Sequence, residues 1–167
     1  MVGIQTLEEF GKKLERFRFA VLHHSIPRGA ERGSHWDLLL EQPPGLGDGL
    51  KTFEICVPPE AWGKPSVARQ LSDHRHHYLD YEGPVYGNRG HVARVMEGHI
   101  EWQSISELSM TLSLELDNFC TAAELSEPVR GVIELRKLMG ETDDELWELI
   151  LEMPLPPESN SCPQARD

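Results

Sequence analysis

The most constraining feature of this sequence is a series of short segments with alternating apolar and polar residues, separated by glycine and proline. After Gly90 these segments are 91–96, 99–105, 109–116 and 132–138, with Gly98 expected to make a tight connection between the first two. Earlier segments predicted as strands are 19–22, 35–41, 51–57 and 67–71. Many short strands at close spacing favour an antiparallel barrel or sandwich over alternating strands and helices. We therefore predict a mainly β fold, a compact antiparallel β-barrel.

Helices are expected only at the two ends of this barrel. Residues 6–17 have apolar side chains at helical spacing, and Thr142 can cap a last helix that continues to Leu151. A length of 167 residues suits one domain, because most domains have ~100–200 residues. The sequence thus predicts one domain over residues 1–153, followed by a disordered tail over residues 154–167.

The charge balance narrows the classes of function. With 16 Lys+Arg against 28 Asp+Glu, the net charge of −12 argues against a generic DNA-coating protein, which is normally basic. Residues 1–100 are nearly neutral and contain all 8 histidines, so we expect any chemistry there. The scattered cysteines, the absence of an apolar run of ~20 residues and the absence of a signal-like first segment predict a cytoplasmic protein without a membrane partner.

The segment that begins at His35 is the most informative for chemistry. Alternate residues of a strand share a face, so His35 and Asp37 are expected side by side, with Trp36 and Leu38 on the opposite face. An imidazole and a carboxylate in this arrangement are suited to a transition metal, with His24 at the end of the preceding strand as the third ligand. The simpler interpretation is a polar face of a half-exposed strand.

Three ordered motifs carry a resemblance to a known family. They are F-A-V-L-H-H at 19–24, H-W-D-L at 35–38 and D-H-R-H-H-Y-L-D-Y-E-G at 73–83. Over residues 18–103 the chain resembles the phosphoesterase domain of bacterial DNA ligase D, which reads F-V-V-x-x-H, H-Y-D-L-R-L and D-H-P-x-x-Y-x-x-F-E-G in the same order. Gly87 and Gly90 resemble the glycine-containing segment that follows in that family.

The resemblance implies a compact β-barrel and a manganese-dependent activity in DNA repair that removes a 3′-phosphate or a ribonucleoside from the 3′ end of nucleic acid. His24, His35 and Asp37 would ligate Mn²⁺, or alternatively Zn²⁺, which we expect at one mouth of the barrel. His74 and Tyr78 would contact the reacting phosphate as the catalytic residues. The implied partners are nucleic-acid 3′ ends, above all those of DNA, together with DNA repair proteins.

Two departures from the family pattern affect the phosphate site. Leu39 stands where the family has an arginine, and it is expected to line the pocket on the same strand face as Asp37. The basic residue of the family's V-P-K segment is also missing, because Pro59 follows Val57-Pro58. The loop before His35 is five residues longer than in the family. We expect its arginines, or two later ones, to bind substrate in compensation, with ordinary surface charge as the alternative: Arg28, Arg32, Arg69 and Arg75.

Two other functions remain compatible with the sequence. Leu39 and the acidic balance favour a non-catalytic relative that keeps the metal pocket as a binding module of a repair complex. Two histidines and one aspartate also match the facial triad of a non-haem iron oxygenase. The motif over residues 73–83 has no role in the oxygenase, which places that alternative third.

Overall fold

The computed structural model describes residues 15–119, 124–140 and 145–154. Within them, nine strands and two short 3₁₀ helices follow one another along the chain. In order they are β1 (Phe17–Ser25), β2 (His35–Leu40), β3 (Leu50–Ile55), η2 (Pro59–Ala61), β4 (Ser66–His74), η3 (His76–Leu79), β5 (Gly83–Pro84), β6 (His91–Ile105), β7 (Ser109–Phe119), β8 (Glu124–Lys137) and β9 (Leu146–Glu152). No described helix is long and apolar enough to cross a membrane.

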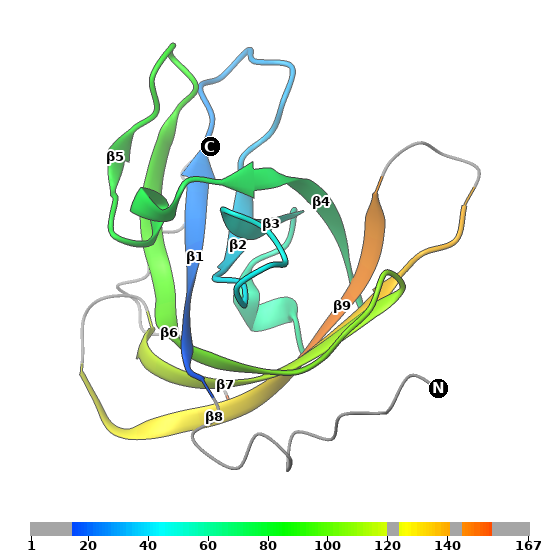
Figure 1. Cartoon of the computed structure of the whole chain (residues 1–167). Helices are drawn as coiled ribbons and strands as arrows, with labels where there is room; N and C mark the ends of the chain where they lie inside the picture. The colour runs from blue at the N-terminus through cyan, green and yellow to red at the C-terminus, as the bar shows by residue number, and fades with distance from the viewer. Residues whose placement is uncertain (1–14, 120–123, 141–144, 155–167) are drawn as a thin grey trace.

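The sheet closes on itself, which confirms the predicted β-barrel. Neighbouring strands follow the order β1-β2-β3-β4-β9-β8-β7-β6, and β6 pairs back with β1 to complete a ring of eight (Figure 1). Every pairing is antiparallel, and β5 adds only a short pairing to the start of β6. Closure leaves no long unpaired edge within the ring.

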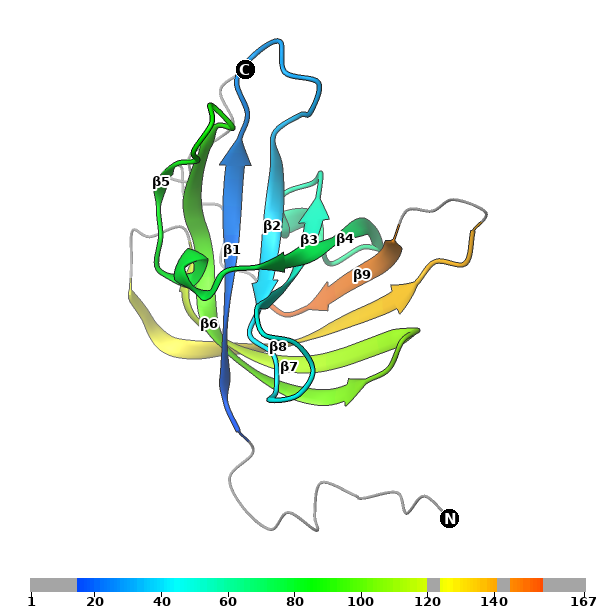
Figure 2. The ribbon, with the colours of Figure 1, turned by 45° about the horizontal axis from the view of Figure 1, so that its top comes forward.

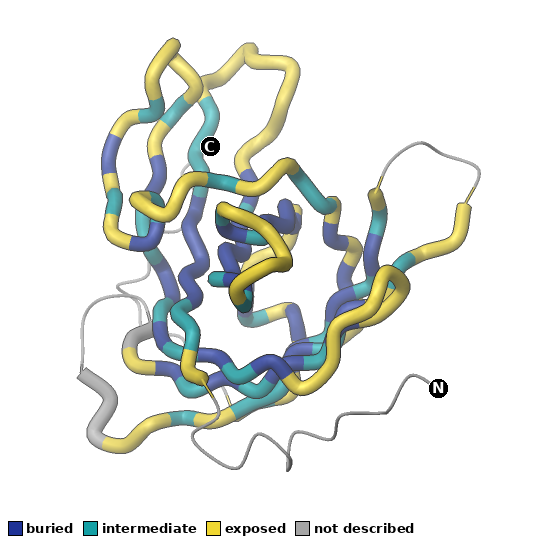
Figure 3. The backbone as a smooth tube through the Cα atoms, viewed as in Figure 1, coloured by how far each residue is buried: buried dark blue, intermediate teal, exposed yellow. Residues whose placement is uncertain are grey.

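The interior of the barrel is an apolar core to which every strand of the ring contributes. Phe53 from β3 meets Trp147 from β9 edge to face, with ring centroids 5.9 Å apart. Trp62, just after η2, is fully buried in the same core, and its Nε1–H donates to the carbonyl of Val57. Figure 3 shows buried stretches along the strands and exposed loops beyond their ends. The barrel is thus filled by side chains.

The helix predicted near the C-terminus is wrong for residues 146–151, which form β9. Trp147, Leu149 and Leu151 are buried while their neighbours are less so, an alternation with period two. β9 pairs with both β4 and β8 and so completes the ring between them. The hydrogen bonds and packing gained on both sides of the strand outweigh the local preference for a helix. Residues 6–14 of the other predicted helix lie outside the described residues, and Phe17 belongs to β1. The predicted tail likewise lies outside them beyond Pro154.

Gly98 was expected to form a turn, but β6 runs through it without interruption. The register between β6 and β7 shifts at Glu97 and Gly98, which marks a β-bulge. A Cβ at Gly98 would lie 2.0 Å from the carbonyl oxygen of Glu115, so only glycine permits this close approach of the two backbones. The glycine allows two strands to come together here.

A second apolar cluster covers the outer face of β1, β2, β3 and β6. Its buried members are Ala20, Leu22, Leu39, Leu50, Leu79 and Val92. Residues 75–82, which carry η3 and are called the crossing segment below, pass over this face in front of β1 (Figure 2). Asp80 accepts from the guanidinium of Arg18 at 2.6 Å, and Arg94 donates to the carbonyl of Leu79 at 2.8 Å. These contacts hold the crossing segment against the wall and so define one side of the pocket described below.

Candidate metal centre

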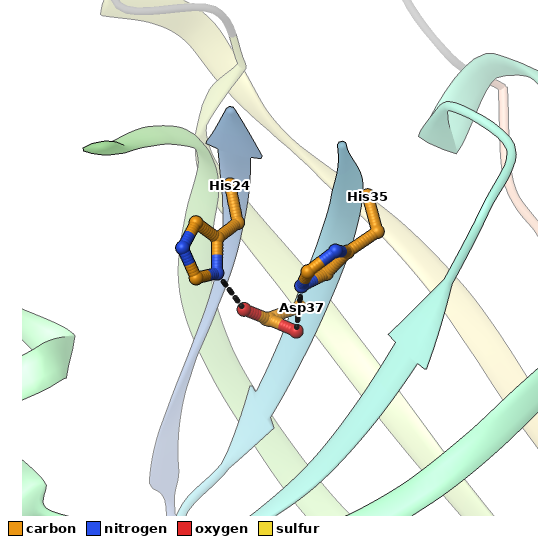
Figure 4. Close-up of side chains that lie close together, drawn as sticks. All are labelled: His24, His35 and Asp37. Carbon is orange, nitrogen blue, oxygen red and sulfur yellow. Dashed lines mark ion pairs between the residues drawn. The ribbon is translucent and has the colours of Figure 1, made fainter. Parts of the chain in front are cut away.

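Strand pairing brings His24, His35 and Asp37 together on the outer face of the barrel wall. His24 lies directly opposite His35 in the pairing of β1 with β2, and Asp37 lies two residues further along β2 (Figure 4). One ligand atom from each residue lies within 4.8 Å of the others. The expected grouping of these three side chains is therefore present.

Each histidine is oriented by a backbone carbonyl on the side away from the aspartate. His24 Nε2 lies 2.6 Å from the carbonyl oxygen of Arg89, and His35 Nδ1 lies 2.9 Å from that of Gly33. A carbonyl only accepts hydrogen bonds, so these nitrogens carry the protons. The other nitrogen of each ring then faces Asp37, in the arrangement that fixes the tautomer of metal-binding histidines.

The inner atoms of the cluster leave a place for a cation. His24 Nδ1 lies 3.5 Å from Oδ2 of Asp37, and His35 Nε2 lies 3.4 Å from Oδ1. Oδ1 is buried and has no hydrogen-bond partner of good geometry. Either a proton or a metal ion has to lie between each ring and the carboxylate. Two imidazoles and one carboxylate are ligands that manganese and zinc accept, so the residues present fit such an ion.

The charge of Asp37 is retained although the residue is only 3 % exposed. Burial raises the pKa of this carboxyl, but its interactions with the rings of His24 and His35 outweigh burial and lower the pKa to about 2. Asp37 is therefore an anion at neutral pH, the form that binds a cation.

Gly90 allows the backbone at Arg89 to come close to the His24 ring. Its φ is +91°, and a Cβ there would lie 2.0 Å from the carbonyl oxygen of Ser25. Any other residue would push the start of β6 away from the end of β1. Glycine thus permits the carbonyl of Arg89 to accept from the His24 ring.

The cluster lines an open pocket of about 670 Å³, and His74 and Tyr78 line the same pocket. A register shift in the pairing of β3 with β4 precedes His74, which lies opposite Leu50 at the end of β4. Tyr78 follows on η3, with its ring centroid 5.7 Å from that of His74. Two motifs that are far apart in the sequence therefore meet around one cavity, as expected.

The predicted arginines separate into two groups. Arg32 and Arg75 line the pocket, whereas Arg28 is exposed and does not line it, and nor does Arg69 on β4. Arg89, which the sequence interpretation overlooked, also lines it. Its position between Gly87 and Gly90, in a turn with positive φ at both glycines, was the available signal.

Two expectations about placement are corrected. Leu39 shares the outer face with Asp37 but is fully buried in the second apolar cluster and does not line the pocket. The crossing segment covers this position, and Tyr78 packs against the same cluster. The cluster of ligands also does not lie at a mouth of the barrel, because the interior is filled by the core and the three residues face outward.

The sequence matches no model of a known protein family, and no curated protein matches it either. Fold and site therefore define the chain as a closed β-barrel with a candidate metal centre in a pocket on its outer wall.

Proposed function

We propose that this protein is a metal-dependent phosphoesterase that acts on 3′ ends of nucleic acid, above all DNA, in end processing. One observation carries the proposal: the three candidate ligands and the pair His74 and Tyr78 line the same pocket. This is the arrangement implied by the resemblance to the phosphoesterase domain of DNA ligase D. The substrate would end in a 3′-phosphate or a 3′-ribonucleoside.

His24, His35 and Asp37 would hold Mn²⁺ or Zn²⁺. Such an ion, when bound, withdraws charge from phosphate oxygens as a Lewis acid. The two carbonyls behind the histidines keep their ligand nitrogens directed at Asp37, so little reorganisation precedes binding.

The remaining residues of the pocket are suited to a phosphate group. The Tyr78 hydroxyl can donate to a phosphate oxygen. His74 Nδ1–H donates to the carbonyl of Ser72 at 3.0 Å, which leaves Nε2 to exchange a proton with the leaving oxygen. Arg32, Arg75 and Arg89 add positive charge around the same cavity, whose volume of about 670 Å³ is within the usual range for sites that bind small ligands.

A non-catalytic binding module is the second candidate, and the burial of Leu39 favours it. Leu39 offers no guanidinium at this strand position, and leucine cannot replace the paired hydrogen bonds of an arginine to a phosphate. A non-haem iron oxygenase would use the three ligands but leaves His74 and Tyr78 without a role.

Incubation of the full chain with Mn²⁺ and a duplex with a recessed 3′ end tests the proposal. The end carries either a phosphate or a single ribonucleotide, and the readouts are product length and released phosphate. We expect processing by the parent and by His76→Ala, whose exposed ring does not line the pocket, and none by His35→Ala. A metal-loaded parent that binds the duplex but leaves both ends intact would contradict the phosphoesterase and favour the binding module.

A further inference from the structure

A second buried carboxylate lies beside the candidate metal centre. In the strand register Glu54 on β3 is opposite Asp37 on β2, so both side chains are on the outer face. Glu54 is only 8 % exposed. Two carboxylates directly opposite each other repel, and a buried carboxylate needs a compensating cation. Glu54 therefore needs a partner other than an ion that Asp37 would hold.

That partner is Arg32, which the long loop between β1 and β2 brings to the site. Nη2 of Arg32 pairs with Oε2 of Glu54, and Arg32 also lines the pocket. Its side chain is about half exposed, at 50 %. A guanidinium has five N–H donors, of which one carboxylate engages at most two in the usual fork. The remaining donors of Arg32 are available to a second anion.

We propose that Glu54 is a positioning residue that holds Arg32 in the pocket as the cation that contacts the substrate phosphate. This inference rests on the proposed function and names one determinant of its anion binding. An arginine on a loop is poorly preorganised, and an ion pair with a buried carboxylate reduces the freedom that it loses on binding. Glu54 thereby gives a loop residue part of the rigidity that an arginine on the strand would have at Leu39.

The charges of the site are consistent with this role. With a divalent ion on neutral histidines, the carboxylates of Asp37 and Glu54 together cancel the charge of the ion. Arg32 then leaves one net positive charge beside the metal, which favours an anionic ligand. The other charged residues that line the pocket cancel one another: Glu31, Asp73, Arg75 and Arg89. Arg69 lies opposite Glu54 on β4 but does not line the pocket, so it offers a comparison with a cation that neighbours Glu54 without lining the cavity.

Inorganic phosphate is the probe, and its binding to the Mn²⁺-loaded full chain is followed by ³¹P relaxation, which detects phosphate near the ion. We expect Arg32→Gln to weaken phosphate binding by about tenfold or more, because a hydrogen bond to a charged group is lost. Arg28→Gln, in the same loop but outside the pocket, and Arg69→Gln should change it less than about twofold. Mn²⁺ affinity and thermal unfolding, measured for each variant, report whether the site and fold persist.

Glu54→Gln separates positioning from simple electrostatics. Loss of a nearby negative charge by itself would tighten phosphate binding, whereas loss of positioning weakens it. We expect a several-fold loss from Glu54→Gln in the parent and no further loss in the Arg32→Gln background, because Glu54 acts through Arg32. Glu54→Asp should recover part of the affinity.

Tighter or unchanged binding in Glu54→Gln, or an equal loss in both backgrounds, would overturn the positioning role. If a parent that cleaves 3′ ends shows either pattern, only this inference fails. If phosphate binding by the Glu54→Gln and Arg32→Gln variants changes as expected but no 3′ end is processed, only the proposed reaction fails. A metal-loaded parent that binds no phosphate contradicts both.

Discussion

The inner and outer faces of β1 and β2 use adjacent residues in opposite ways. His23 points toward the interior side and packs against Trp36, with ring centroids 4.8 Å apart, and its burial lowers its pKa. His24, the next residue, faces outward, where both of its ring nitrogens have polar neighbours. The inner face is built from apolar contacts that fill a closed space, whereas the outer face keeps polar groups oriented by carbonyls. The difference assigns stability to the inner face and binding to the polar part of the outer face, beside the second apolar cluster.

Truncation of an inner-face side chain should give the largest loss of stability. Phe53 is fully buried and meets Trp147, so Phe53→Ala leaves a cavity and should cost about 3–5 kcal/mol of unfolding free energy. Urea unfolding monitored by tryptophan fluorescence measures this. The fraction that remains folded should bind metal as the parent does, and selective loss of metal binding would remove the distinction between the faces.

A charge at Leu39 tests how far the apolar part of the outer face extends. Leu39→Arg places a guanidinium in a fully buried position beneath the crossing segment and should cost about 3 kcal/mol. Urea unfolding compares it with Leu39→Met, which keeps the volume and should cost less than about 1.5 kcal/mol. If Leu39→Arg is as stable as the parent and processes 3′ ends faster, position 39 belongs to the pocket after all.

The adjacent histidines provide the most specific comparison of the two faces. At a metal concentration about 100 times Kd, the parent should gain about 2.7 kcal/mol of unfolding free energy, because only the folded chain holds the three ligands together. His24→Ala should lose this gain, and chelation should remove it from the parent. His23→Ala should keep it although the variant itself is less stable. Thermal unfolding with and without metal measures each difference, and equal metal responses in the two variants would contradict the assignment.

The smallest expected effect concerns the ion pair that holds the crossing segment. The hydrogen bond from Arg18 lowers the pKa of Asp80 below its ordinary 3.8. The ion pair therefore stabilises the folded state fully above the unfolded-state pKa of about 3.8. This stabilisation is lost as the pH falls through the lower pKa of Asp80 in the folded state. Because both side chains are exposed, Asp80→Asn should cost less than about 1 kcal/mol at pH 7. Unfolding measured from pH 7 into acid should show the difference between the parent and the variant shrink as the pH falls below 3.8. A difference that stays constant over this range would show another origin.

Local alternation was sufficient to predict most strands and the barrel, because each strand has one face on the core. It was not sufficient for β9, whose short apolar pattern fits both periods and is decided by closure of the ring. Gly98 looked like a turn because its role depends on the distant Glu115.

The same limit applies to the site. The alternation from His35 predicts both the face that His35 shares with Asp37 and the apolar core face opposite it. Whether the polar face lies at a mouth or on the outer wall depends on all eight strands. The local sequence around Glu54 and Arg89 was not sufficient to predict that they belong to the site. Glu54 reaches it through the strand register and Arg89 through a turn.

Anomalous diffraction from crystals grown with MnCl₂ tests the central claim most directly. The account predicts an anomalous peak on the outer wall of the barrel, about 2 Å from His24 Nδ1, His35 Nε2 and a carboxylate oxygen of Asp37. The peak should be absent from crystals of Asp37→Asn grown in the same way. Manganese bound elsewhere, with the three side chains of the parent in place and no peak between them, would contradict the account.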